Sequence, residues 1–141
     1  MKTELMSEET KIKRVHTLAD CSNRSMEDCT AGLLALEDTL YVIGGKWKLK
    51  IISALRMGGS SRFNQLQQTV TGISARILSK ELKELELNGF IKRKVDTGTP
   101  VVVIYEITEY SNTLGSVLTE MINWGVKHKD KIKREYKELG V

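Results

Sequence analysis

The 141-residue sequence contains few of the residues that build metal centres, disulfide frameworks or membrane segments. It has one proline, two cysteines and two histidines, and His16 and His128 lie far apart in the chain. Two cysteines with such scattered histidines do not make a zinc site, so we expect no bound metal. No apolar run approaches the ~18 residues that a membrane helix needs, and charged residues interrupt the N-terminal segment where a signal peptide would be apolar. We therefore expect a cytoplasmic protein without membrane contact, whose cysteines are free thiols.

Motifs for catalysis or nucleotide binding are also missing. The sequence lacks a nucleophile elbow, and neither Gly44-Gly45 nor Gly58-Gly59 continues into the Gly-Lys-Ser/Thr pattern of a phosphate-binding loop. We expect a protein that is not an enzyme and that binds no cofactor. The composition, 40% hydrophobic and 28% charged, is that of an ordinary globular domain, and the net charge of +4 admits an anionic partner without requiring one.

The most strongly patterned stretch, residues 74–88, predicts an amphipathic helix with both ends marked. Ser74 is a candidate N-cap, and Gly89 can take the left-handed conformation that commonly ends a helix. At ~100° per residue the apolar and basic residues fall on opposite faces: Leu78, Leu82 and Leu85 against Arg76, Lys80 and Lys83. Glu81 and Glu84 project from one flank. Taken alone, the basic face is either an ordinary solvated surface or a surface that lies in a DNA major groove.

The remaining elements predict a mostly helical α+β fold. A polar arm, residues 1–25, with a short helix around residues 8–18, precedes a domain at 26–141. Within it we expect helices at 26–43, 46–56, 63–70, 74–88 and about 108–138, a strand-like segment at 60–62, and strands at 90–95 and 101–107. Two short helices joined by a glycine turn at Gly72 and followed by a basic hairpin form a winged helix-turn-helix, here with N- and C-terminal dimerisation helices.

The last helix carries more apolar residues than one buried stripe requires, and either Thr108 or Ser111 is expected to cap it. We expect its dimer interface to consist of Leu114, Val117, Leu118, Met121, Ile122 and Trp124. The alternative is a core helix with a frayed, charged tail; we favour dimerisation because a small domain cannot easily cover so many apolar residues alone. Trp47, spaced helically with Ile51 and Leu55, is expected in the core rather than stacked on bases.

Four stretches together resemble the HxlR-type bacterial transcriptional regulators, within the broader MarR-like winged-helix group. They are Ile-Gly-Gly-Lys-Trp-Lys at 43–48, Arg-Phe-Asn-Gln-Leu at 62–66, Gly-Ile-Ser-Ala-Arg-Ile-Leu at 72–78, and Tyr-Glu-Ile-Thr at 105–108 continuing to Trp124-Gly125. They occur in the right order and spacing over about residues 35–126. The resemblance implies a homodimer that binds a roughly two-fold DNA operator and regulates a neighbouring gene, most simply as a repressor.

Two recognition helices related by a dyad enter successive major grooves about 34 Å apart. We expect base contacts from Ala75, Arg76, Ser79 and Lys80, and contacts to the DNA backbone from Arg62, Lys83, Lys92, Arg93, Lys94 and Lys46. Lys46 is either a backbone contact or merely solvated. The alternative function is a winged helix used only for protein contacts, for which binding to duplex DNA would be absent or insensitive to salt.

Some members of the family that this chain resembles sense oxidants or electrophiles through a cysteine before the first conserved helix, commonly followed by proline. Cys29 is fifteen residues before Gly44 rather than ten, and Thr30 follows it. Cys29 is therefore either a redox sensor, with an oxidant or small molecule as effector, or an inert small residue in a loop or interface. If the intervening segment is helical, Cys21 and Cys29 stand ~12 Å apart, too far for a disulfide within one chain.

Overall fold

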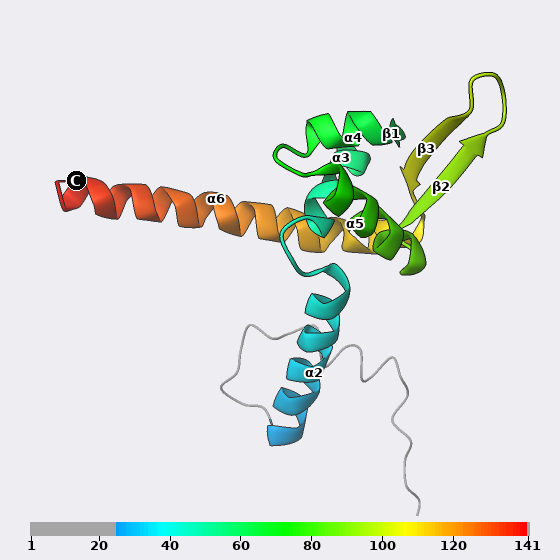
Figure 1. Cartoon of the computed structure of the whole chain (residues 1–141). Helices are drawn as coiled ribbons and strands as arrows, with labels where there is room; N and C mark the ends of the chain where they lie inside the picture. The colour runs from blue at the N-terminus through cyan, green and yellow to red at the C-terminus, as the bar shows by residue number, and fades with distance from the viewer. Residues whose placement is uncertain (1–24, 141) are drawn as a thin grey trace, which may run out of the picture. The chain divides into compact units, whose positions relative to one another are not determined.

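The computed structural model describes residues 25–140 and divides the chain into two compact units, Met1–Gly44 and Gly45–Val141 (Figure 1). The expected polar arm and the short helix around residues 8–18 lie outside the described residues. In the first unit, α2 (Met26–Ile43) is the described element. Ser25 is its N-cap, because Ser25 Oγ accepts a hydrogen bond from the Asp28 N–H at 3.3 Å.

The second unit has the predicted order of a winged helix-turn-helix. Its elements are α3 (Lys48–Gly58), β1 (Ser61–Arg62), α4 (Phe63–Thr69), α5 (Ala75–Leu87), β2 (Ile91–Asp96), β3 (Val102–Ile107), the 3₁₀ helix η2 (Tyr110–Leu114) and α6 (Gly115–Glu138). The strands form an antiparallel sheet in the order β1-β3-β2, and the β2–β3 hairpin extends from it as the wing (Figure 1). Ile91 lies opposite Ile107 at the base of the wing, and Asp96 lies opposite Val102 near its tip.

The core of the second unit lies where α3, α4 and α5 meet the base of the wing. Its most deeply buried side chains are Ile51, Ile52 and Leu55 of α3, Leu66 of α4, Leu78, Leu82 and Leu85 of α5, and Ile91 of β2. Burying each such aliphatic side chain contributes ~1.5–3 kcal/mol relative to leaving it exposed. The predicted apolar face of α5 is confirmed, and its burial decides which face of that helix remains in solvent.

The boundary expected at residue 46 is wrong, because α3 begins at Lys48 and Trp47 occupies its N-cap position. Trp47 is half-buried rather than part of the fully buried core. The ammonium groups of Lys46 and Lys50 lie 4.7 and 5.2 Å from the centroid of its indole ring. Its indole also lies beside Gly72, 3.9 Å from the position a Cβ would take there. Trp47 therefore lies next to the turn that precedes α5, with two lysines of its own segment over its ring.

The start expected for the last helix is also wrong, since α6 begins at Gly115 and η2 precedes it. Thr108 Oγ1 accepts a hydrogen bond from the Ser111 N–H at 3.3 Å, so Thr108 caps the 3₁₀ turn instead of α6. Arg56 Nη1 donates to Ser111 O at 3.3 Å and to Asn112 Oδ1 at 3.1 Å. These contacts from α3 fix the turn through tertiary structure, which explains why local capping signals did not locate the helix start.

Candidate nucleic-acid interface

The recognition helix, α5, has both of its ends fixed by local interactions. Gly72 has a φ of 86°, in the left-handed region that favours glycine, and so lets the chain turn sharply between α4 and α5. Ser74 Oγ accepts a hydrogen bond from the Ile77 N–H at 3.2 Å, which confirms the predicted N-cap. Beyond Leu87, Gly89 has a φ of 79° and ends the helix as predicted.

The face of α5 opposite the core is open to solvent. It exposes the residues predicted for base contacts together with one predicted phosphate contact: Ala75, Arg76, Ser79, Lys80 and Lys83. Because the helix is anchored by its buried leucines, these five side chains share one surface. The small side chains of Ala75 and Ser79 lie among three cations, which leaves room for a DNA base edge to approach the helix closely.

The carboxylates on the flank of α5 are paired with α3. Lys48 Nζ lies 2.8 Å from Glu81 Oε2 and 2.8 Å from Glu84 Oε2. Partial burial acts to lower the pKa of Lys48, but the two carboxylates outweigh it and raise the pKa above the ordinary 10.5. The hydrogen bond and the charge of Lys48 lower the pKa of Glu84. Lys48 and Glu84 are therefore both charged at neutral pH. The predicted separation of Glu81 and Glu84 from the basic face is confirmed, while the role of Lys48 was not predicted.

The wing has two faces with different chemistry. In the β2–β3 register Arg93 lies opposite Tyr105, whereas Lys92 lies opposite Glu106. Because side chains alternate along a strand, Arg93 and Tyr105 share one face, and Lys92, Lys94 and Glu106 share the other. The face with Arg93 borders α5, where a crevice of about 250 Å³ is lined by Ser79, Leu82, Lys83, Glu86, Arg93 and Tyr105. Arg93 and Lys83 thus converge from wing and recognition helix, and Tyr105 joins them without having been predicted.

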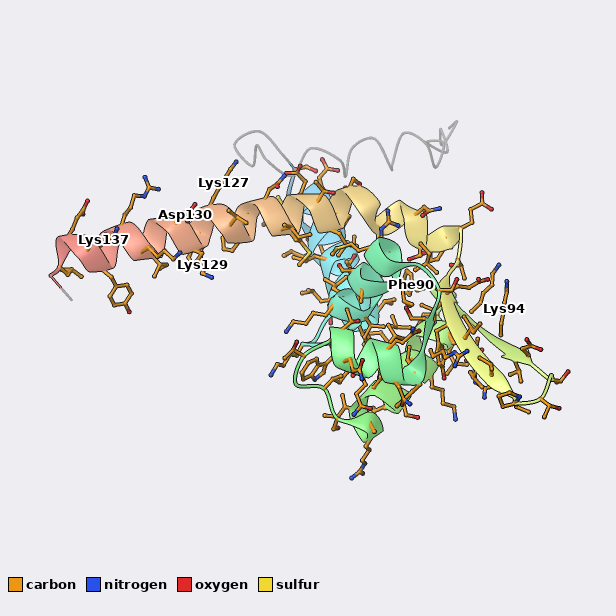
Figure 2. All side chains as sticks on the ribbon, turned by 90° about the horizontal axis from the view of Figure 1, so that it is seen from above. Phe90, Lys94, Lys127, Lys129, Asp130 and Lys137 are labelled. Atoms are coloured by element: carbon orange, nitrogen blue, oxygen red, sulfur yellow. The ribbon has the colours of Figure 1, made fainter. Side chains whose placement is uncertain are left out.

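Lys94 is held by an ion pair on the second face of the wing. Its Nζ lies 2.7 Å from Glu106 Oε1, and the hydrogen bond from Lys94 lowers the pKa of Glu106. The Lys94 side chain projects from the hairpin in Figure 2 and remains largely exposed. Within residues 25–140, Lys92 and Arg93 form no ion pair. Of the three wing cations, Lys92 and Arg93 are therefore the more available to an added anion.

The two other predicted backbone contacts lie outside α5 and the wing. Arg62 is exposed at the end of β1 and the start of α4, where its N–H donates to Gln65 Oε1 at 2.8 Å. Lys46 is exposed just before α3, with its ammonium over the Trp47 ring. Within the described residues, the Arg62 guanidinium and the Lys46 ammonium form no ion pair with a carboxylate.

α6 exposes a long apolar surface that its own unit does not cover. Of the six predicted interface residues, Leu118 is buried in the core and Leu114 belongs to η2; the exposed ones are Val117, Met121, Ile122 and Trp124. Met121 and Ile122 also line an open groove of about 540 Å³ against α3 and the turn before α5. Beyond Trp124 the helix continues past α3–α5 (Figure 1) with basic side chains such as Lys127, Lys129 and Lys137 projecting from it (Figure 2).

Cys29 lies in the first turn-and-a-half of α2, where its side chain is exposed and is not in a disulfide. Cys21 lies outside the described residues. Within residues 25–140, no three acidic, cysteine or histidine side chains gather as they would around a metal ion, and no helix is long and apolar enough to cross a bilayer.

A capped, exposed basic helix after a glycine turn, beside a basic wing, defines a DNA-binding protein of the winged helix-turn-helix class. A sequence model of the HxlR-like helix-turn-helix family matches residues 42–133, from the end of α2 through most of α6. The chain belongs to this family, as the resemblance of its four motifs predicted.

Individual relatives agree with this assignment. The chain is 38% identical over 115 residues to the uncharacterized HTH-type transcriptional regulator YdeP of Bacillus subtilis (strain 168), covering 82% of this chain and 85% of that protein. A solved structure of the redox regulator HypR in its reduced form matches with a TM-score of 0.65 and 35% identity, over 70% of this chain and 97% of that one. The crystal structure of quinone-bound YodB from B. subtilis matches with a TM-score of 0.56 and 33% identity, over 67% of this chain and 98% of that one.

Proposed function

We propose that this protein is a homodimeric transcriptional repressor that binds a two-fold DNA operator, with α5 in the major groove and the wing on the DNA backbone. The observation that carries the proposal is the exposed surface of α5, where three cations and two small side chains face solvent beside Arg93 of the wing. The family membership supports it, since the curated relatives are helix-turn-helix transcriptional regulators.

The proposal assigns base reading to the N-terminal half of α5. An arginine can make two hydrogen bonds to guanine, a lysine can contact the same edge, and a small apolar side chain fits a thymine methyl. These roles fall to Arg76, Lys80 and Ala75, with Ser79 as a further hydrogen-bonding group. Phosphate contacts come from Lys83, Lys92, Arg93 and Arg62, with lesser contributions from Lys94, which Glu106 engages, and from Lys46.

The dimer is proposed to form through the exposed apolar residues of α6, Val117, Met121, Ile122 and Trp124. α2 offers a second apolar surface, because Leu33, Leu36 and Leu40 are exposed along it. Burying these surfaces against a second copy would remove them from water, and a dimer whose two copies of α5 stand ~34 Å apart would reach successive major grooves.

The test is selection of bound sequences from genomic DNA fragments, followed by titration of the full chain against a selected duplex and a random one. We expect two chains per duplex, a palindromic consensus, and a log of the association constant that falls with log salt by about 0.9 per phosphate neutralised. A template carrying the selected site should yield less transcript when the protein is added. Binding that is absent, or that does not change with salt, would instead favour a winged helix used for protein contacts.

A second proposal, on what controls DNA binding, is that Cys29 is a thiol sensor. Its exposure supports this, since only an accessible thiol reacts quickly with an oxidant or an electrophile. Among the related proteins, one is a redox regulator and another was crystallised with quinone bound. Reaction at Cys29 would alter α2, whose apolar surface we assign to the dimer, and would thereby change operator affinity.

A further inference from the structure

Lys48 joins α3 to α5, the helix that is proposed to read DNA. It is the first residue of α3, and its ammonium lies between two carboxylates that stand one turn apart on α5. The side chains of Lys48 and Glu81 are only 13% and 15% exposed, whereas Glu84 is 39% exposed and Lys94 and Lys131 of the other described ion pairs are more than 60% exposed. Water and salt screen the Lys48–Glu81 pair less than they screen exposed pairs.

The charge on α5 explains why this pairing bears on DNA binding. The helix carries three basic and three acidic side chains, so its formal charge is zero: Arg76, Lys80 and Lys83 against Glu81, Glu84 and Glu86. A neutral helix gains nothing from the phosphate field unless its negative charges are held away or compensated. Lys48 offsets one of the two negative charges on the α3 flank and holds both carboxylates there, so that the field at the exposed face is dominated by its cations.

The pairing also restricts how α5 can rotate. The buried Leu78, Leu82 and Leu85 set which face of α5 points away from the core. The ion pairs add a directional contact on the flank of the helix, because rotation of α5 about its axis would carry at least one of the two carboxylates away from the Lys48 ammonium, which lies 2.8 Å from each. The side chains that would reach base edges lie on the same rigid helix, so its rotation decides where they point.

We propose that Lys48 is a positioning residue for DNA recognition, which restrains the rotation of α5 and offsets part of the negative charge of Glu81 and Glu84 beside the reading face. This inference rests on the proposed DNA-binding function. Lys48 need not touch DNA in this arrangement; it acts through α5.

The test uses the full-length protein, a selected operator, a random duplex and a salt series. Lys48→Met removes the charge and keeps the side-chain length, and Lys48→Arg keeps the charge. The triple variant Lys48→Met/Glu81→Gln/Glu84→Gln lacks both the cation and the carboxylates. Lys137→Met is the control, because it removes one charge from an exposed position near the end of α6, where no carboxylate pairs with it in residues 25–140.

We expect Lys48→Met to weaken binding to both duplexes by about tenfold at low salt, to weaken it less as salt rises, and to reduce discrimination between the two. Lys48→Arg and the triple variant should recover binding to random DNA, and Lys137→Met should lose no more than about threefold on either duplex. Because Lys48→Met leaves two carboxylates without their partner and the triple variant does not, a thermal melt of each variant separates the charge effect from a folding defect.

Two results would overturn the inference: Lys48→Met that binds both duplexes like the wild type, or a triple variant that binds random DNA as weakly as Lys48→Met. A wild-type chain that binds no duplex even at low salt would overturn the proposed function instead. Failure of the Lys48 inference can therefore be distinguished from failure of the proposed DNA-binding function.

Discussion

Lys94 and Glu106 form an ion pair across the wing, with 2.7 Å between Nζ and Oε1. The carboxylate competes with DNA phosphates for this lysine. We predict that Glu106→Gln will raise affinity for any duplex by about two- to fivefold at low salt, with a slightly steeper salt dependence. Glu109→Gln is the control, since Glu109 is exposed and forms no ion pair in residues 25–140. Equal gains in both variants would mean that only net charge matters.

Arg76 and Arg93 have different proposed roles: Arg76 contacts base edges, and Arg93 contacts phosphates. We predict that Arg76→Ala will lower the preference for operator over random DNA by about tenfold, because one base-edge contact contributes ~1–3 kcal/mol of discrimination. Arg93→Ala should weaken binding to both duplexes by a similar factor and reduce the salt slope by about one. Titrations of each variant against both duplexes measure this, and the same pattern of loss in the two variants would contradict it.

The sequence predicts the recognition helix well because its signals are local. Ser74 and Gly89 act on the backbone groups of their own helix, and the apolar spacing of Leu78 and Leu82 reports one buried face. Strand alternation likewise placed Arg93 on the face of the wing that carries the buried Ile91. The fold class follows from the order of such local signals.

The remaining features depend on residues that are distant in sequence. The start of α6 is set by Arg56, more than fifty positions before Ser111, so the capping pattern around Thr108 was misleading. The partners of Lys48 on α5 and of Lys94 on β3 likewise come from neighbouring elements. Sequence periodicity shows which face a charge occupies but not which charge lies opposite. The site residues were therefore predictable as a set, and their pairing was not.

The ion pairs also make a prediction about stability and pH. Hydrogen bonds from Lys48 and Lys94 lower the pKa of Glu84 and Glu106 below the ordinary 4.5. A carboxylate whose pKa is lower in the folded state stabilises the fold above its unfolded pKa, and this contribution is lost as pH falls through the folded value. We predict that the Tm of the wild type falls below about pH 4.5 and that Glu84→Gln/Glu106→Gln shows a shallower fall. Thermal melts followed by circular dichroism measure both, and parallel curves would contradict the prediction.

If the dimer forms through α6, a substitution on the exposed surface of that helix should prevent dimerisation without unfolding the chain. Trp124 is 67% exposed on α6, so Trp124→Glu should leave the fold of the chain intact while placing a charge in the proposed interface. We predict that this variant is monomeric at micromolar concentration and binds the operator more than about tenfold more weakly. Val101→Glu is a control for the mass measurement alone, because Val101 is 66% exposed in the β2–β3 hairpin, which the proposal places on DNA rather than in the dimer. Sedimentation velocity reports the mass, and a dimeric Trp124→Glu would exclude this position from the interface.

The sensor proposal is tested by exchanging one sulfur for oxygen. A serine at position 29 keeps the size and exposure of Cys29 but cannot be oxidised by hydrogen peroxide or alkylated by a quinone under mild conditions. If reaction at Cys29 controls operator binding, the wild type should lose most of its affinity after treatment, and Cys29→Ser should keep it. Cys21→Ser is the matched control, because it removes the other thiol and should respond like the wild type.

Operator titration before and after treatment, with thiol counting on the same samples, measures the response. Release from DNA that is unchanged in Cys29→Ser would eliminate this residue as the sensor, whereas loss of the response in both variants would require the two thiols to act together.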